Sequence, residues 1–260
     1  LTNVHRIEGG GTEFPMMIMN GSASEGLIVH ETGHQWVHGI FGNNEWREGW
    51  LDEGFDSFLT NWYFVEQGAP ATLWDNSLEG IREMAVAGAT QPISFESAAF
   101  RDPRTYSAMT YTKPSLVFRM LRDLVGEDVF RQALHDFYHA KALEHVTEAD
   151  LRASFRHASG LNLDWFFEQW IHTTDMLDYG IANAETWQVD GEWVARVEVV
   201  REGDAYMPVD LRVGTETRRL EKRDATQVVY FRLGERPTEA VLDPGNVLLD
   251  VDVGNNSVTF

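Results

Sequence analysis

A chain of 260 residues can bury a substantial core, and its hydrophobic content of 43% excludes an intrinsically disordered protein. Its formal net charge of −20 at pH 7 argues against nucleic acid or an anionic membrane as a partner. Because the chain has no cysteine, disulfides and thiolate ligands are excluded, and any metal must be bound by histidine and carboxylate side chains.

The first expected element is a short apolar strand at residues 16–19, which ends at an Asn-Gly turn signal. A helix is expected to follow it. Ser22 or Ser24 can cap this helix, and Glu25 lies in its first turn, where a negative charge is favourable.

This helix carries the sequence His-Glu-Thr-Gly-His at residues 30–34. Residues four apart lie on one helix face, about 6 Å apart along the axis, so His30 and His34 can share one tetrahedral ion. Glu31 lies at the rim of that face and can reach a zinc-bound water without being a ligand. The motif therefore predicts a hydrolytic zinc site. For the pentapeptide alone, a solvated helix with two histidines stays open as the alternative.

Glu53 is the candidate for the third zinc ligand. Eighteen residues separate it from His34, enough to finish one helix, turn and begin a second, antiparallel helix. The helical run at residues 55–64 follows Glu53 directly, so its carboxylate can point back at the first helix. The rival design places a third histidine six residues after His34, where this chain has Ile40.

Three further polar residues lie near the motif. His38 is eight residues from His30, about 12 Å along a helix axis, which is too far to share an ion, and we interpret it as a flanking polar residue. Side chains that hydrogen-bond the ring nitrogens facing away from the metal are expected to fix the imidazole tautomers. Asp52 and Asp56 are close to Glu53 in sequence, but we interpret both as acidic residues on a solvated helix face.

The chain is expected to stay mostly helical to about residue 179. The segment at residues 163–171 is strongly apolar and is interpreted as core, the alternative being that its aromatic side chains line a substrate groove. Other helix signals are a stop at Gly88, a start near Pro114 with a stop at Gly126, and a capping box at residues 147–150.

After residue 180 the hydrophobic period changes from that of a helix to that of a strand. Apolar and polar residues alternate at residues 193–199, 208–213 and 227–231. Short strands at this spacing predict an antiparallel sandwich of about eighty residues.

The zinc motif with its eighteen-residue spacer resembles the gluzincin metallopeptidases of the aminopeptidase N and leukotriene-hydrolase type. Upstream, Gly-Gly-Thr-Glu-Phe at residues 10–14 stands where that family has Gly-x-Met-Glu-Asn. The resemblance implies that Glu13 binds the free α-amine of the substrate. Thr12 and Phe14 depart from the family pattern, as they do in a subset of the family that reads Gly-Gly-x-Glu-Tyr-Pro.

Two downstream segments share the resemblance. Residues 106–113 resemble the family's Tyr-x-Lys-Gly stretch, with Pro114 in place of the glycine. This implies that Tyr111 stabilises the tetrahedral intermediate, and Tyr106 is the competing candidate. Residues 242–250 resemble the last strands of the β-sandwich that follows the catalytic domain in these enzymes.

The resemblance implies an α+β protein with two domains. A mostly helical, thermolysin-like zinc peptidase domain is expected at residues 1–178, followed by an antiparallel β-sandwich at residues 179–260. The family has an amino-terminal β-domain and further strands before Gly9, where this chain has eight residues and starts with Leu1, so we expect an excised or truncated piece or a reduced member.

The function implied is that of a zinc aminopeptidase acting on peptides, with one Zn²⁺ per chain bound by His30, His34 and Glu53. Glu31 is expected to act as general base and Tyr111 to stabilise the oxyanion. The alternatives are a thermolysin-like endopeptidase and a non-catalytic binding module derived from such a peptidase. The chain has no apolar run long enough to span a membrane. Its side-chain preference, oligomeric state and localisation, export included, stay open.

Overall fold

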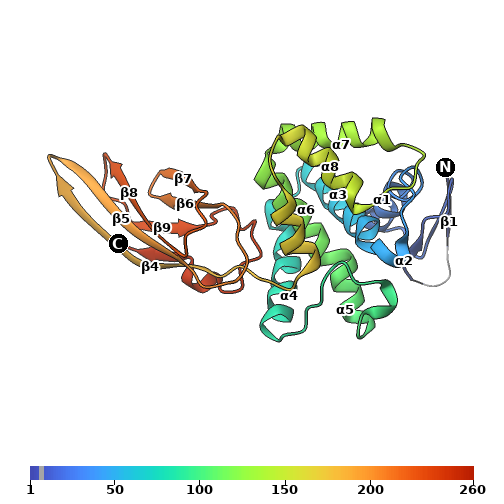
Figure 1. The fold of residues 1–260 in the computed structure, drawn as a ribbon, viewed down its shortest axis with the longest axis horizontal. Helices are drawn as coiled ribbons and strands as arrows, with labels where there is room; N and C mark the ends of the chain where they lie inside the picture. The colour runs from blue at the N-terminus through green and yellow to red at the C-terminus, as the bar shows by residue number, and fades with distance from the viewer. Residues whose placement is uncertain (6–8) are drawn as a thin grey trace. The chain divides into compact units, whose positions relative to one another are not determined.

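The computed structural model describes residues 1–5 and 9–260 and separates them into two units, which are treated one at a time. Unit 1 consists of Leu1–Ile81 and Ala89–Thr174, and unit 2 of Arg82–Gly88 and Asp175–Phe260. Helices dominate the first unit and antiparallel strands the second (Figure 1). The expected α+β class is therefore confirmed.

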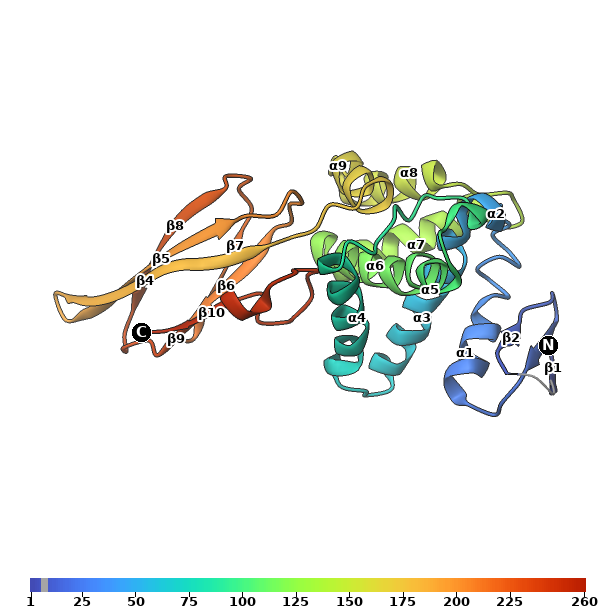
Figure 2. The ribbon, with the colours of Figure 1, turned by 90° about the horizontal axis from the view of Figure 1, so that it is seen from below.

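Unit 1 begins with a three-stranded sheet of order β1-β3-β2. Strand β3 (Met17–Asn20) pairs in parallel with β1 (Thr2–His5) and antiparallel with β2 (Gly11–Thr12). The strand expected at residues 16–19 is thus confirmed, one residue later than predicted. Helix α1 (Glu25–Gly33) follows and lies beside β2 and β3 (Figure 2).

Helices and single turns make up most of the rest of unit 1 in the described part of the chain. Thr147 and Asp150 form the expected capping box. In the apolar segment at residues 163–171, Leu163, Phe166, Phe167, Trp170 and Ile171 are buried, so the prediction that the segment contributes to the core is confirmed. The elements are α2 (Glu45–Glu48), η1 (Gly49–Leu51), α3 (Glu53–Glu66), η2 (Ala71–Trp74), α4 (Asp75–Val86, whose residues from Arg82 on belong to unit 2), η3 (Ser97–Ala99), α5 (Pro103–Ser107), η4 (Ala108–Thr112), α6 (Lys113–Val125), α7 (Glu127–Lys141), α8 (Glu148–Ser159), α9 (Asp164–Phe167) and η5 (Glu168–His172).

An aromatic core fixes helix α3 against its neighbours. Phe55 and Phe58 of α3 pack on Phe118 of α6, with ring centroids 4.7 and 5.9 Å apart. Phe58 also meets Phe130 of α7 at 5.4 Å. These rings are buried, and burying large aromatic side chains supplies much of the apolar stabilisation of a core. This packing therefore fixes the position of the first turn of α3, which begins at Glu53.

Two glycines allow the elements around that turn to approach each other closely. A Cβ atom at Gly33, in the last turn of α1, would lie 2.0 Å from Asp56 Oδ1 of α3. A Cβ atom at Gly54 would lie 2.4 Å from Pro114 Cγ at the start of α6. A larger residue at Gly33 must displace the Asp56 carboxylate, and one at Gly54 must displace the Pro114 ring.

Unit 2 contains two antiparallel sheets that lie in two layers (Figure 2). Within the described part of the unit, the sheet orders are β4-β5-β8 and β10-β9-β6-β7. The alternation expected at residues 193–199 is confirmed from Ala195 on, since Ala195, Val197 and Val199 are buried and the two residues between them are of intermediate exposure. The strands are β4 (Tyr179–Val189), β5 (Glu192–Arg201), β6 (Val209–Val213), β7 (Glu216–Leu220), β8 (Thr226–Leu233), β9 (Glu239–Leu242) and β10 (Ser257–Thr259), with the turn η6 (Val253–Asn255).

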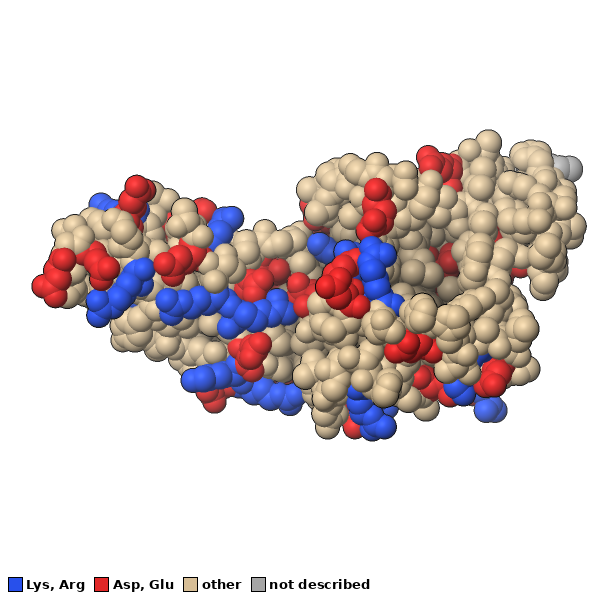
Figure 3. Space-filling model, turned by 90° about the horizontal axis from the view of Figure 1, so that it is seen from above, with Lys and Arg blue, Asp and Glu red and all other residues tan. Residues whose placement is uncertain are grey.

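Charged side chains of both signs are interspersed on the face that Figure 3 draws. Several arginines of unit 2 pair with acidic neighbours, such as Arg196 with Glu198 at 2.8 Å and Arg212 with Glu239 at 3.0 Å. No helix in the described ranges is long and apolar enough to cross a membrane.

The close approach of α1 and α3 predicts a large difference between two glycine substitutions. Gly33→Ala forces a Cβ atom against the buried Asp56 carboxylate and should lower the free energy of unfolding by about 1–3 kcal/mol. Gly80→Ala in α4 meets no atom within 4 Å among the described residues and should raise it by about 0.5–1 kcal/mol. Chemical denaturation of both variants measures this. Equal stability of Gly33→Ala and the parent chain would show that the contact is not tight.

Candidate metal centre and active site

The two histidines of the motif lie at the end of α1 and face the first turn of α3. Helix α1 ends at Gly33, but His34 keeps right-handed angles (φ −60°, ψ −12°), so the helical spacing extends through the second histidine. His30 Nε2 and His34 Nε2 are 3.2 Å apart, and Glu53 Oε2 is 3.1 Å from each. The structure therefore brings together the three residues that the sequence proposes as ligands.

These three atoms fit a tetrahedral zinc ion. Bonds of about 2.0–2.1 Å to nitrogen and oxygen at tetrahedral angles place ligand atoms roughly 3.3 Å from each other. The observed separations of 3.1–3.2 Å are close to that value. Two imidazoles and one carboxylate are also the ligand set that leaves one position for water or substrate in catalytic zinc sites.

Two acidic residues that flank Glu53 in the sequence contact the imidazoles at their Nδ1 atoms. Asp56 Oδ2 lies 3.0 Å from His30 Nδ1, and Asp52 Oδ1 lies 2.8 Å from His34 Nδ1. Asp56 is 0% exposed and Asp52 is 1% exposed, so their interpretation as residues of a solvated face is wrong. The signal that points to Asp56 is its spacing, because a residue three positions after Glu53 shares the helix face of that ligand.

The carboxylates fix the tautomers of both imidazoles. A carboxylate next to each Nδ1 retains the proton there, so both Nε2 atoms present lone pairs to the centre. With Glu53 Oε2, three acceptor atoms then face each other at 3.1–3.2 Å. Only a cation or additional protons can stabilise that arrangement, which supports the assignment of a metal centre.

The local electrostatics also favour positive charge at this point. Burial lowers the pKa of His30, but Asp56 and Glu53 outweigh it and raise the pKa to about 9. At His34, Asp52 and Glu53 likewise outweigh burial and raise the pKa to about 11. Burial raises the pKa of Glu53, but the two imidazoles outweigh it and lower the pKa to about 2. The carboxylates of Asp52, Glu53 and Asp56 thus make this site favourable for a cation.

Glu31 lies beside the centre without being one of the three ligands. It is 4% exposed, and its Oε2 atom has no hydrogen-bond partner in the described part of the chain. Burial raises its pKa to about 7, against the opposing effect of His30 and His34. A buried carboxylate with an unsatisfied oxygen and a pKa near neutrality has the properties of a general base.

Tyr111 contacts the centre through Glu53. It lies in η4, a π-helical turn between α5 and α6, and its hydroxyl donates to Glu53 Oε1 at 2.6 Å. Burial and the Glu53 carboxylate raise its pKa above the ordinary value, so the hydroxyl stays protonated and remains a donor. The ring of Tyr106 lies 6.3 Å from that of Tyr111, and the ring of His30 lies at the same distance from Tyr111. π-Helical turns of this kind occur often at functional sites.

Glu13 lies between β2 and β3 in a segment that Gln35 fastens to the end of the motif helix. Gln35 Nε2 donates to the carbonyl oxygens of Glu13 and Phe14, at 3.4 and 3.3 Å, and its Oε1 accepts from Met16 N at 2.7 Å. After burial and the two imidazoles, the Glu13 charge also affects the pKa of Glu31, which it raises. The Glu13 carboxylate is therefore close enough to Glu31 to affect its protonation. Sequence reasoning missed Gln35, whose signal is its position directly after the second histidine.

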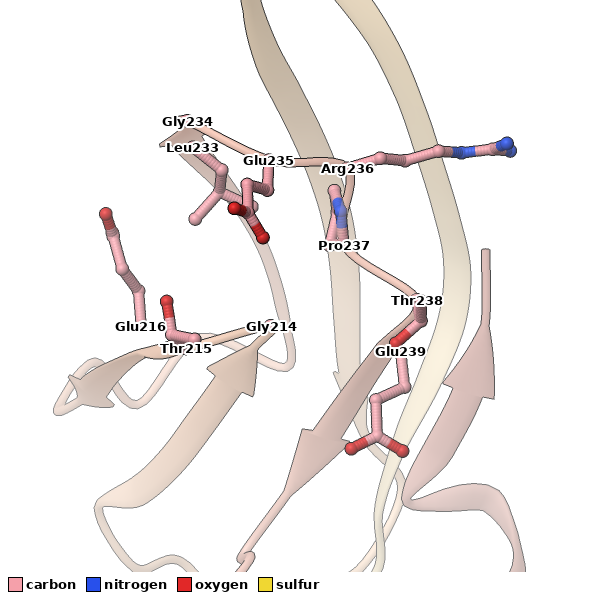
Figure 4. A pocket seen from close by; sticks show the side chains of 10 residues that line it. All are labelled: Gly214, Thr215, Glu216, Leu233, Gly234, Glu235, Arg236, Pro237, Thr238 and Glu239. Carbon is pink, nitrogen blue, oxygen red and sulfur yellow. The ribbon is translucent and has the colours of Figure 1, made fainter.

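Two other features lie outside this centre. His38 does not join the ligands and instead lies near Glu45 and Asp52. In unit 2, a hollow of about 680 Å³ opens between the β6–β7 turn and the loop at residues 234–238 (Figure 4). Arg236 points away from this hollow, towards the ring of Trp193. Among the described residues, the two groups with metal-ligand spacing both lie in unit 1.

Known proteins resemble the chain over the region that contains this centre. The chain matches the sequence model described as "Peptidase family M1 domain" over residues 17–170. Aminopeptidase Ey from Gallus gallus is 28% identical over 136 residues, which are 48% of this chain and 14% of that protein. Putative aminopeptidase-2 from Caenorhabditis elegans is 27% identical over 177 residues, which are 62% of this chain and 9% of that protein. The chain thus spans less than a fifth of the length of these relatives.

Two solved structures share the fold. Legionella pneumophila aminopeptidase A in complex with aspartic acid has a TM-score of 0.72 at 17% identity, over 95% of this chain and 31% of that one. A mutant M1 zinc metallopeptidase from Deinococcus radiodurans, bound to a Tyr-Ser-Ala substrate, has a TM-score of 0.55 at 20% identity, over 65% of this chain and 38% of that one. The family match covers more than half of the chain and includes His30, His34 and Glu53, and the chain therefore belongs to peptidase family M1.

Proposed function

We propose that the chain is the catalytic part of a zinc aminopeptidase that removes amino-terminal residues from peptides. The observation that carries this proposal is the buried Glu31 carboxylate, which has an unsatisfied oxygen next to the ligand atoms of His30, His34 and Glu53. A buried carboxylate without a partner destabilises the fold. A non-catalytic binding module would gain nothing from keeping one, so this feature favours an enzyme.

The division of labour follows from the positions of the side chains. Zn²⁺ bound by the three ligands would polarise the scissile carbonyl and lower the pKa of a water molecule. Glu31 accepts the proton of the attacking water and passes it to the leaving amine. Its pKa of about 7 suits both steps, since a base with a pKa near the working pH can take up and release a proton.

Tyr111 is proposed to stabilise the oxyanion. Its hydroxyl is already next to the centre through the 2.6 Å bond to Glu53 Oε1, and rotation of that hydroxyl redirects the donor to a substrate oxygen. One donor of this kind commonly contributes about 3 kcal/mol to stabilisation of a transition state. The bond to Glu53 also orients the ligand while no substrate is present.

Glu13 is proposed to bind the α-ammonium of the substrate. Gln35 bonds the backbone of the Glu13 segment to the end of the motif helix, and the Glu13 charge is close enough to raise the pKa of Glu31, which supports this role. A charge-assisted hydrogen bond from an ammonium to a partly desolvated carboxylate is among the stronger polar contacts. It would place the first peptide bond, and no later bond, over the zinc ligands.

We further propose that the catalytic domain covers residues 1–178 and that residues 179–260 form a scaffold domain. Strand β4 begins at Tyr179, and the strands that follow it belong to the two sheets of unit 2. Unit 2 also includes Arg82, although it lies within residues 1–178, and its guanidinium donates to the carbonyl oxygens of Leu248 and Asp250 at 3.1 and 2.7 Å. The scaffold role is supported by the position of both groups with metal-ligand spacing in the described residues, which lie in unit 1.

Replacement of the proposed base should separate metal binding from chemistry. Glu31→Gln keeps the size of the side chain and removes its ability to accept a proton, so hydrolysis of an aminoacyl-anilide should fall by about 10²–10⁴-fold. Zinc content, measured by elemental analysis, should stay that of the parent chain. The exposed Glu79→Gln serves as the matched control and should change neither quantity. A metal-replete Glu31→Gln protein with more than half of the parent activity contradicts the assignment.

The amine-binding role of Glu13 predicts a specific pattern of non-additivity. Glu13→Ala and acetylation of the peptide amine should each lower kcat/KM strongly. Applied together they should lower it little further, because both delete the same contact. Mass spectrometry of the products distinguishes stepwise trimming from internal cleavage. If acetylated peptides are cut internally as fast as unblocked ones are trimmed, the endopeptidase alternative replaces this proposal.

A further inference from the structure

A second group of potential metal ligands lies next to the catalytic centre. It includes Asp52, the carboxylate that contacts His34 Nδ1. It consists of His38, Glu45 and Asp52, and one ligand atom from each lies within 4.8 Å of the others. His38 Nδ1 is 2.9 Å from Glu45 Oε1 and 3.6 Å from Asp52 Oδ2. These two separations bracket the roughly 3.3 Å expected between ligands of one zinc ion.

The turn that follows the motif helix places His38 in this group. The chain folds back through a bond from Gly39 N to His34 O at 2.9 Å. His38 adopts the left-handed region there, with φ 82°. A Cβ atom at Gly39 would lie 2.6 Å from the carbonyl oxygen of Gln35, so the turn requires glycine. The imidazole is thereby directed to the start of α2, where Glu45 lies.

Asp52 supplies an independent indication of a ligand. Its side chain is 1% exposed, and its Oδ1 atom faces His34 Nδ1. Its other oxygen, Oδ2, has no hydrogen-bond partner in the described ranges and is directed towards His38. A simple ion pair between His38 and Glu45 would leave this buried oxygen unsatisfied, which is costly. A cation between the three side chains satisfies it.

The chemistry of the group selects the type of cation. One imidazole nitrogen and two carboxylates suit Zn²⁺, whereas Ca²⁺ and Mg²⁺ prefer oxygen ligands alone. The side chains of His38 and Glu45 are 28% and 50% exposed, so an ion can enter from solvent and keep water in its remaining positions. An open site of this kind should bind more weakly than the enclosed centre beside it.

We propose that His38, Glu45 and Asp52 form a second, weaker Zn²⁺ site that is coupled to the catalytic centre through Asp52. A cation at Asp52 Oδ2 withdraws charge from the carboxylate whose other oxygen orients His34. His34 then becomes a poorer ligand, because a carboxylate bonded to the second ring nitrogen raises the basicity of a metal-binding imidazole. Zinc in excess therefore inhibits. The binding claim is independent of the proposed function, whereas the inhibition rests on it.

The test is a titration with Zn²⁺ alone, followed with a chromophoric competing chelator. The protein should take up one tightly bound equivalent and then a second, weaker one. His38→Asn removes the imidazole while keeping a residue that tolerates the left-handed region, and should weaken the second equivalent by about 10-fold or more. Glu45→Gln should act in the same direction. Neither variant should change the first equivalent.

A histidine pair on α7 provides the matched control. His135 Nε2 and His139 Nε2 lie 3.1 Å apart on the surface of that helix, in positions that also allow chelation. His139→Gln should leave the second equivalent unchanged. The proposal is overturned if the parent chain binds a single equivalent, if His38→Asn binds two as tightly as the parent, or if His139→Gln removes the second one.

An activity assay on the same samples tests the coupling. Raising Zn²⁺ beyond one equivalent should inhibit the parent chain, and His38→Asn should relieve that inhibition. Two equivalents without inhibition would overturn the coupling and retain the site. If the chain hydrolyses no peptide at all, the proposed function fails, and the titration still decides whether the second site exists.

Discussion

The structure depends on three lone pairs being forced to face one another. The Nε2 atoms of His30 and His34 and one oxygen of Glu53 lie 3.1–3.2 Å apart in a partly buried site, an arrangement that is repulsive without a positive charge at its centre. Asp56 and Asp52 impose it, because each retains an Nδ1 proton and so directs the other ring nitrogen inward. The site is therefore preorganised for a cation before any ion arrives.

That preorganisation is supported by the packing behind it. The aromatic core around Phe58 and Phe118 fixes α3, and the missing side chain of Gly33 lets the Asp56 carboxylate reach the end of α1. The same close packing brings the π-helical turn with Tyr111 against the first turn of α3. Small shifts of either helix would separate groups that must meet within a few tenths of an ångström, so the core determines the geometry of the chemistry.

Much of this arrangement could be predicted from the sequence. Spacing alone brings His30 and His34 onto one face, and alternation alone reveals the strands of unit 2, because both follow from local geometry. The burial of Asp52 and Asp56 could not be predicted in this way, since a charge buried by a neighbouring helix has the same sequence signature as one on a solvated face. The position of Tyr111 could not be predicted from local pattern either, because a π-helical turn changes which side chains share a helix face. Only the resemblance to a known family indicated this residue.

The geometry of the centre requires the two imidazoles and Glu53 to bind one zinc ion together. Zinc K-edge X-ray absorption of the chain loaded with a single equivalent tests it most directly, because the technique reports the ligands of the metal itself. We expect a shell of nitrogen and oxygen atoms at about 2.0–2.1 Å from the zinc, together with the outer scattering of two imidazoles. A spectrum with one imidazole or none would contradict it, since the metal would then lie elsewhere.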